Sequence, residues 1–175
     1  GVLVLPVNLS LNLDQPDEVA LLGSVRFDGN SISLDKQIPK FEGIRGSVEF
    51  TEKTLKTDDL KLRVLDGDAR VSGSLGAEGE GLQVDGTLTA AALLALADMP
   101  GISVIDGRTT YQLRIRELPL GGLDIQATSP LVGLAVALPA PLGKSAEQRQ
   151  TFSLRWAATQ RRTDYRHAIT VTMGD

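Results

Sequence analysis

Apolar and polar residues alternate along most of this 175-residue chain. In the stretch 3–13, Leu or Val occupies every odd position, and mostly polar residues stand between them. The same period of two recurs in further segments, namely 60–64, 69–75, 82–88, 111–116, 123–127, 152–156 and 165–173. A period of two is typical of β-strands with one buried face. The sequence therefore predicts a mostly β protein.

Short glycine-rich segments separate the predicted strands. They are "DGN" (28–30), "LDGDA" (65–69), "GAEGEG" (76–81) and "LGG" (120–122). Asp-Gly and Gly-Gly supply the positive φ angles that tight hairpins need. Strands this close in sequence pair antiparallel, because parallel neighbours need longer crossovers. We therefore expect a long, twisted antiparallel sheet.

One or two short helices are expected beside this sheet. The stretch "LTAAALLALADMPG" (88–101) has Thr89 as a candidate N-cap and is stopped by Pro100. A weaker helical pattern covers 15–22. The longest apolar run, 90–97, is far shorter than the ~20 residues that a membrane-spanning helix needs.

Three segments align without gaps and are candidate internal repeats: "PDEVALLGSVRF" (16–27), "PKFEGIRGSVEF" (39–50) and "PGISVIDGRTTY" (100–111). Each has Pro, then Gly seven residues later, then an aromatic residue four further on. Such a Gly would permit a bulge or a close approach within a strand. Coincidence is the alternative, because the chain contains 18 Gly and 8 Pro.

The chain has neither an initiator Met nor a signal-peptide pattern. We therefore expect residues 1–175 to be a single β-rich segment of a longer protein, with sub-repeats starting near 16, 39 and 100.

Composition and charge narrow the classes of function. A net charge of −4 argues against nucleic-acid binding. The absence of Cys excludes disulfides and thiolate chemistry, and a lone His167 gives little basis for a nucleophilic triad. Asp66 and Asp68 resemble calcium ligands, but the downstream carboxylate is missing. We expect no enzymatic activity, no cofactor and no metal site, and a β-rich enzyme is the least favoured alternative. The basic clusters 114–116 and 161–162 are interpreted as solvated strand faces, with an anionic headgroup contact as the alternative.

The stretch "PAPLGKS" (139–145) ends like a phosphate-binding loop. That motif needs Gly five residues before the Gly-Lys pair, where this chain has Leu138. Pro139 and Pro141 also remove two N–H donors from the cradle. We therefore reject nucleotide binding and interpret the stretch as a turn after a buried strand at 131–138.

An apolar sheet face must be covered, either by a second sheet in a closed β-sandwich or by curling into an open apolar groove that takes a ligand. Aromatic residues make up only 4% of the chain, so few bulky rings are available to fill the interior. This composition favours the groove. The β-sandwich stays open as the alternative.

The stretch "DGRTTYQLRIRELPLGGLDIQATSPLVGLAVALPAPLGKSA" (106–146) resembles the AsmA-like family of bacterial envelope proteins, closest to the C-terminal region of its YhdP group. The segment 38–75 is similar in style. The resemblance implies a parent protein that is anchored in the inner membrane by a helix outside this chain. It also implies a periplasmic β-rich body that carries phospholipid acyl chains along an apolar groove between the inner and outer membranes.

We therefore expect a non-catalytic phospholipid-transfer segment, with phospholipid acyl chains as its ligand. The alternative is a non-catalytic β-sandwich that serves as an interaction or scaffold module of the cell envelope. The candidate groove-lining residues are Leu60, Leu62, Val64, Val71, Leu82, Val84, Leu113, Ile115, Leu123, Ile125, Leu134 and Val136. For each of them, ordinary core packing is the alternative role.

Overall fold

A computed structural model describes residues 2–4, 7–11, 19–33, 38–76, 79–98, 104–118, 121–161 and 164–174 of the chain. The elements are β1 (Val2–Val4), β2 (Val7–Leu11), β3 (Val19–Ile32), β4 (Phe41–Thr51), β5 (Leu55–Val64), β6 (Gly67–Leu75), β7 (Gly81–Thr89), α1 (Ala90–Leu96), β8 (Ile105–Glu117), β9 (Gly122–Ser129), β10 (Leu134–Val136), β11 (Phe152–Arg161) and β12 (Asp164–Met173).

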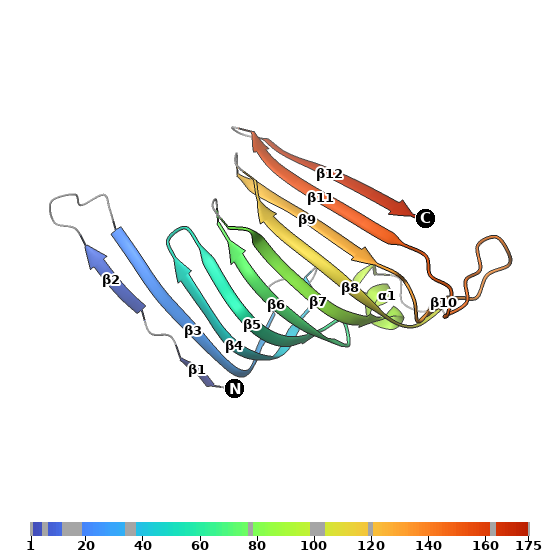
Figure 1. The fold of residues 1–175 in the computed structure, drawn as a ribbon, viewed down its shortest axis with the longest axis horizontal. Helices are drawn as coiled ribbons and strands as arrows, with labels where there is room; N and C mark the ends of the chain where they lie inside the picture. Colours follow the sequence, from blue (N-terminus) through green and yellow to red (C-terminus); the bar gives the residue numbers. More distant parts are fainter. Residues whose placement is uncertain are drawn as a thin grey trace.

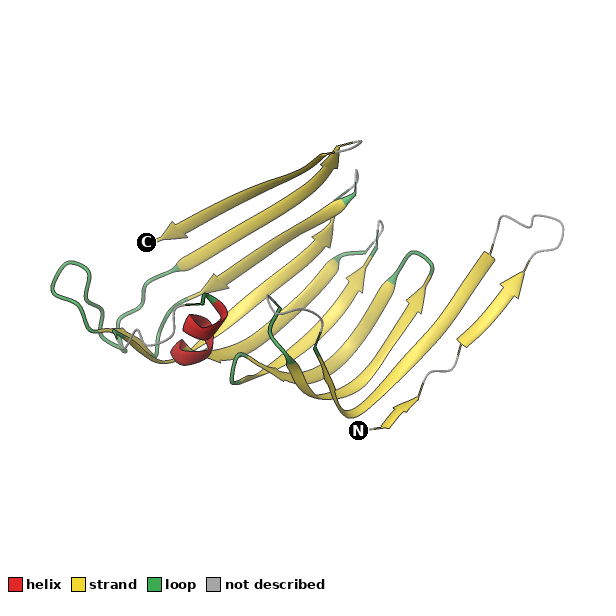
Figure 2. Ribbon diagram, turned by 180° about the vertical axis from the view of Figure 1, so that it is seen from behind, coloured by secondary structure: helices red, strands yellow, loops and turns green. Residues whose placement is uncertain are grey.

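All of these strands belong to one antiparallel sheet. Ten of them follow one another in the order β1-β3-β4-β5-β6-β7-β8-β9-β11-β12, while β2 pairs with β3 and β10 with β8. Figures 1 and 2 show a curved sheet with β1 and β12 at opposite ends and no second sheet against it in the described part of the chain. The predicted open antiparallel sheet is therefore confirmed, and the closed β-sandwich is wrong.

The strand register sorts the side chains onto two faces, because residues that pair directly across strands project to the same side. One row of such partners crosses seven strands: Leu60, Val71, Val84, Leu113, Ala127, Leu154 and Val171. A second row contains Leu82, Ile115, Ile125, Trp156 and Ile169. We call this side of the sheet the apolar face and the opposite side the polar face.

The core lies on the apolar face of β4 to β7. Ile44, Leu62, Val64, Ala69 and Val84 form its buried cluster, with exposed fractions of 9% or less. Half-buried hydrophobic side chains pack against this cluster, among them Phe27, Phe41 and Tyr111. The described residues provide no second sheet to cover it, so we infer that the sheet curves toward this side. The apolar face is therefore the concave one.

Two of the three candidate repeats meet where β3 pairs with β4, because residues 23–27 of the first lie opposite residues of the second, 39–50. Gly23 lies opposite Phe50, and Gly46 lies opposite Phe27. A Cβ atom at Gly23 would collide with the Phe50 ring, so the missing side chain makes room for the aromatic group. In the third segment, Tyr111 instead pairs with a glycine from outside the segments, Gly86. The repeat itself stays a prediction.

The helix α1 begins where the sequence predicts it. The Thr89 side chain accepts a hydrogen bond from the Ala92 amide at 3.2 Å, which is N-cap geometry. The second helix, expected at 15–22, is wrong where the structure describes it, because residues 19–22 belong to β3. Residues 15–18 lie outside the described part. No described helix is long and apolar enough to cross a bilayer.

Three of the four predicted turns connect antiparallel neighbouring strands, and one does not. The "LDGDA" segment turns at Leu65 and Asp66, with φ angles of 54° and 56°. The "LGG" segment also turns, because the Gly121 amide donates to the Leu118 carbonyl at 2.9 Å. The expected turn "DGN" is instead a bulge within β3, with Gly29 at φ 75°. In "GAEGEG", the residues on either side of the undescribed 77–78 are joined by the Gly79 amide, which donates to the Gly76 carbonyl at 3.0 Å.

Candidate functional site

The register places all of the predicted lining residues on the apolar face. Leu62, Val64, Val84 and Leu134 are buried among them, whereas the rest are half-buried. Side chains of this intermediate exposure can be touched by a ligand without a change in the fold. Whether they contact lipid stays a prediction.

The longest row of apolar partners runs across the strands rather than along them. Its seven residues extend from β5 to β12, which is six strand spacings in the sheet order. At ~4.8 Å per spacing, the row is ~29 Å long. The apolar face is thus a continuous strip that follows the long direction of the sheet.

Exposure of this strip increases toward the C-terminal edge. On β5, Val64 is 8% exposed, whereas Ile169 and Val171 on β12 are 66% and 56% exposed. The apolar face is therefore most buried near β5 to β7 and most exposed at β12. A ligand on the apolar face has most access at β12.

Trp156 is part of the second row, between Ile125 and Ile169, and we did not include it among the candidate lining residues. Its ring stacks on His167 with centroids 5.6 Å apart and an interplanar angle of 14°. The period of two in 152–156 would have identified it, because Trp156 shares its face with Phe152 and Leu154.

The helix α1 stands at one end of the apolar face, where β7 ends and β8 begins (Figure 2). Ala90 and Leu94 are the residues that it buries. Ala92, Ala95 and Leu96 line a crevice of ≈ 330 Å³ that also includes Val64 and Leu65 at the end of β5.

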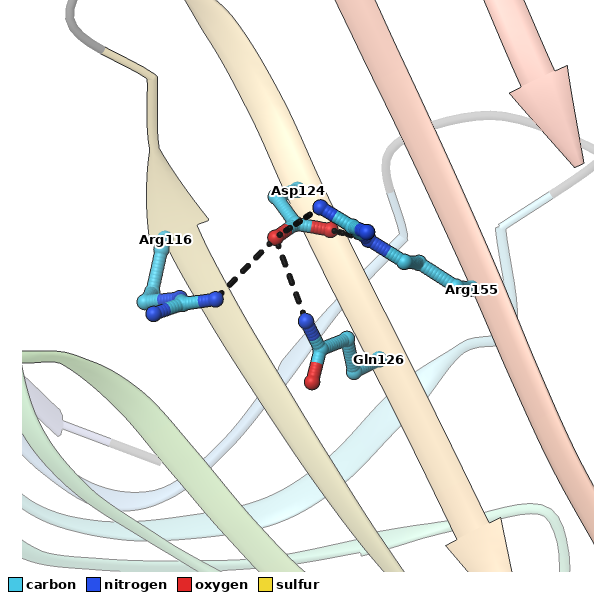
Figure 3. A network of polar contacts seen from close by, with 4 residues as sticks. All are labelled: Arg116, Asp124, Gln126 and Arg155. Atoms are coloured by element: carbon cyan, nitrogen blue, oxygen red, sulfur yellow. Dashed lines mark hydrogen bonds and ion pairs between the residues drawn. The ribbon is translucent and has the colours of Figure 1, made fainter. Parts of the chain in front are cut away.

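The polar face carries a network around a buried carboxylate, shown in Figure 3. The Asp124 side chain on β9 is only 2% exposed. Arg155 on β11 donates to both of its oxygens, from Nε at 2.9 Å and Nη2 at 3.2 Å. Arg116 on β8 and Gln126 on β9 each donate to Asp124 Oδ2 at 3.2 Å. The hydrogen bonds from Arg155 lower the pKa of Asp124 against the opposing effect of its burial.

This network ties three strands together and leaves no buried donor or acceptor unpaired among its side chains. Its four polar side chains point away from the apolar rows. We interpret Asp124 as a structural residue that joins strands in the C-terminal half of the sheet, rather than as a catalytic group.

A second polar feature is an open depression of ≈ 520 Å³ on the same face, beside the segment 149–151. Asp85 lies in it and accepts hydrogen bonds from Gln112 at 2.8 Å and Gln83 at 3.0 Å. Within the described ranges, no three His, Cys, Asp or Glu side chains are grouped so as to hold a metal ion.

The connection between β10 and β11 contains the feature that sequence reasoning missed. Only 134–136 of the predicted strand 131–138 is a strand. Lys144, which belongs to the stretch interpreted from the sequence as a turn, is only 7% exposed. Its ammonium group donates to the carbonyl oxygens of Leu131, Leu134 and Ser145 at 2.7, 2.8 and 3.0 Å. The lysine of "PAPLGKS" is therefore buried inside this connection, and its hydrogen bonds hold the connection together.

Fold and site together define a class: an open, curved, single-layered antiparallel sheet with a continuous apolar concave face. The chain matches the family model described as "YhdP protein" over residues 1–174 and belongs to the YhdP family. Membership of this family suggests a bacterial envelope protein related to lipid transport. No curated protein and no solved structure matches the chain.

Proposed function

We propose that this chain is a segment of a non-catalytic phospholipid-transfer protein that holds acyl chains along its apolar face. The observation that carries the proposal is the row of seven apolar partners from Leu60 to Val171, which no second layer covers in the described residues. An uncovered apolar strip of this length is unusual for a water-soluble surface and is typical of a binding surface.

The chemistry of the strip suits a long hydrocarbon chain. Burial of each methylene group contributes about 0.8 kcal/mol, and this contribution does not depend on direction. A strip of Leu, Val and Ile therefore stabilises an acyl chain similarly at each strand, so the chain can shift by one strand without losing a specific contact. Polar headgroups would stay in water at the open side.

The cellular setting is part of the same proposal. The parent protein would be anchored in the inner membrane through residues outside this chain, and the sheet would lie in the periplasm. Acyl chains would move along it between the inner and outer membranes. The family match and the strip support this setting.

Two neighbouring residues on β9 offer a matched test. Ala127 lies in the apolar row between Leu113 and Leu154, and Thr128 projects from the polar face. We expect the native chain to carry phospholipid in native mass spectrometry. Ala127→Asp should lose that lipid because a carboxylate would stand in the hydrocarbon path, whereas Thr128→Asp should retain it.

A second readout uses the tryptophan at 156, which is the only one in the chain. Phospholipid with brominated acyl chains should quench its fluorescence in the native chain and in Thr128→Asp, but not in Ala127→Asp. Circular dichroism would show that strand content persists in both variants. Equal lipid content in the two variants, or a native chain that neither carries nor takes up phospholipid, would refute the proposal.

A further inference from the structure

The connection between β10 and β11 presents apolar side chains to solvent. Leu138 and Leu142 are 41% and 71% exposed, and Pro139, Ala140 and Pro141 between them are also exposed. We call residues 138–142 the apolar tip. It contains no charged residue. The connection that carries it projects beyond the end of the sheet in Figures 1 and 2.

Few backbone N–H groups of the tip need a hydrogen bond from water. Its prolines have no N–H to satisfy. The Leu138 amide donates to the Val136 carbonyl at 3.0 Å, and the Leu142 and Gly143 amides donate to the Pro139 carbonyl at 3.0 and 3.2 Å. In hydrocarbon, an unpaired backbone donor is costly, so internal pairing lowers the cost of leaving water.

The base of the tip is held firmly. The backbone amides and carbonyls of Val136 and Lys144 pair with each other at 2.8 and 3.0 Å. Beneath this pair, the Lys144 ammonium group donates to three carbonyl oxygens. Burial of a lysine is expensive unless it is fully hydrogen-bonded. The chain thus uses a buried cation to present a fixed, uncharged apolar loop.

We propose that the apolar tip inserts into the interfacial region of a lipid bilayer. Its side chains are apolar, its Leu138 and Leu142 amides are paired within the chain, and it carries no charge that would favour a polar protein partner. The contact is hydrophobic rather than electrostatic, so salt should not weaken it. It is a surface separate from the apolar strip and does not require a lipid to be bound there.

A labelling experiment tests the insertion directly. The chain has no Cys, so Leu142→Cys gives one site for an environment-sensitive NBD fluorophore. The matched control is Leu22→Cys, at a leucine of β3 that is 57% exposed. With vesicles of phosphatidylethanolamine and phosphatidylglycerol, we expect a blue shift and stronger emission from the label at 142, in low and high salt, and little change at 22.

Charged substitutions supply the second measurement. Leu138→Asp combined with Leu142→Asp should weaken vesicle co-flotation at least tenfold, and Leu22→Asp should leave it unchanged. All three positions are exposed, so the fold should persist in both proteins. The double variant should still carry phospholipid in native mass spectrometry, which separates this proposal from the function proposed above.

Three outcomes would overturn the insertion. The first is an equal response of the two labels to vesicles, or no response. The second is vesicle binding that disappears in high salt, because the contact would then be electrostatic. The third is a change at position 142 that follows protein concentration without vesicles, because the tip would then be a contact between copies of the chain.

Discussion

Replacing Lys144 by Met tests whether the buried ammonium group holds the β10–β11 connection together. Methionine preserves most of the volume and removes the three hydrogen bonds to Leu131, Leu134 and Ser145. A hydrogen bond made by a charged group contributes about 1.5–3 kcal/mol. The net loss in stability should be smaller than the sum of the three hydrogen-bond contributions, because the variant no longer has to desolvate an ammonium ion.

Two of the three carbonyls also keep another donor. The Leu134 amide reaches the Leu131 carbonyl, and the Gln148 amide reaches the Ser145 carbonyl, both at 3.3 Å. We therefore expect a net loss of about 3 kcal/mol in the free energy of unfolding. For a chain of this size, that loss lowers Tm by roughly 6–12 °C.

The assay is urea denaturation together with amide hydrogen exchange. Lys61→Met is the matched control, because the Lys61 side chain is 67% exposed and lies 3.5 Å from the Asp59 carboxylate. Its loss should cost no more than about 0.5 kcal/mol. In Lys144→Met alone, the amides of Gly133 and Val136 should exchange faster, since their acceptors are Ala146 and Lys144. Equal stability of the two variants, with unchanged exchange at these amides, would refute the role of the Lys144 ammonium group in holding the connection together.

Other substitutions test the network, the close approaches and the helix cap. Asp124→Asn should cost about 1–3 kcal/mol at neutral pH. Because the pKa of Asp124 is lowered in the folded chain, its stabilisation is present above the ordinary carboxyl pKa and is lost as pH falls through the folded value; the two proteins should therefore converge in acid denaturation curves, and a constant difference would contradict this. Gly107→Ala should cost more than about 2 kcal/mol, because φ is 107° and a Cβ atom would meet the Gly133 carbonyl oxygen. Gly29→Ala, at φ 75° with nothing within 4 Å, should cost only about 1 kcal/mol, and equal losses in thermal melts would show that crowding at Gly107 is unimportant. Thr89→Ala should cost about 1 kcal/mol by removing the N-cap bond to Ala92, with an unchanged melting curve as the contrary result.

The strands and the apolar face were predictable because a period of two is a local property. Alternation at 60–64 and 111–116 indicates which side chains share a face of a strand. Antiparallel pairing of neighbouring strands then places these apolar faces on the same side of the sheet. The N-cap at Thr89 was predictable for the same reason, since its partner is three residues away. The open sheet, as opposed to a sandwich, was favoured by composition and by family resemblance rather than by periodicity.

What failed depends on contacts that the sequence does not display. "DGN" bulges instead of turning because β3 continues past Gly29 and pairs further with β4, while the Asn30 side chain accepts the Asp28 amide at 2.9 Å. Lysine is a residue type that is normally exposed, and only the folded connection brings three carbonyl oxygens around Lys144. Asp124 is buried by Arg155, which is 31 residues away.

The row from Leu60 to Val171 takes one residue from each strand that it crosses. Its extent is therefore set by how many strands are stacked, whereas its cross-section is set by the length and bend of each strand. Insertion or deletion of one hairpin would change the row by ~9.6 Å and leave the remaining lining unaltered. An architecture of this kind lets the span of a protein evolve by duplication of hairpins, independently of the chemistry of its surface.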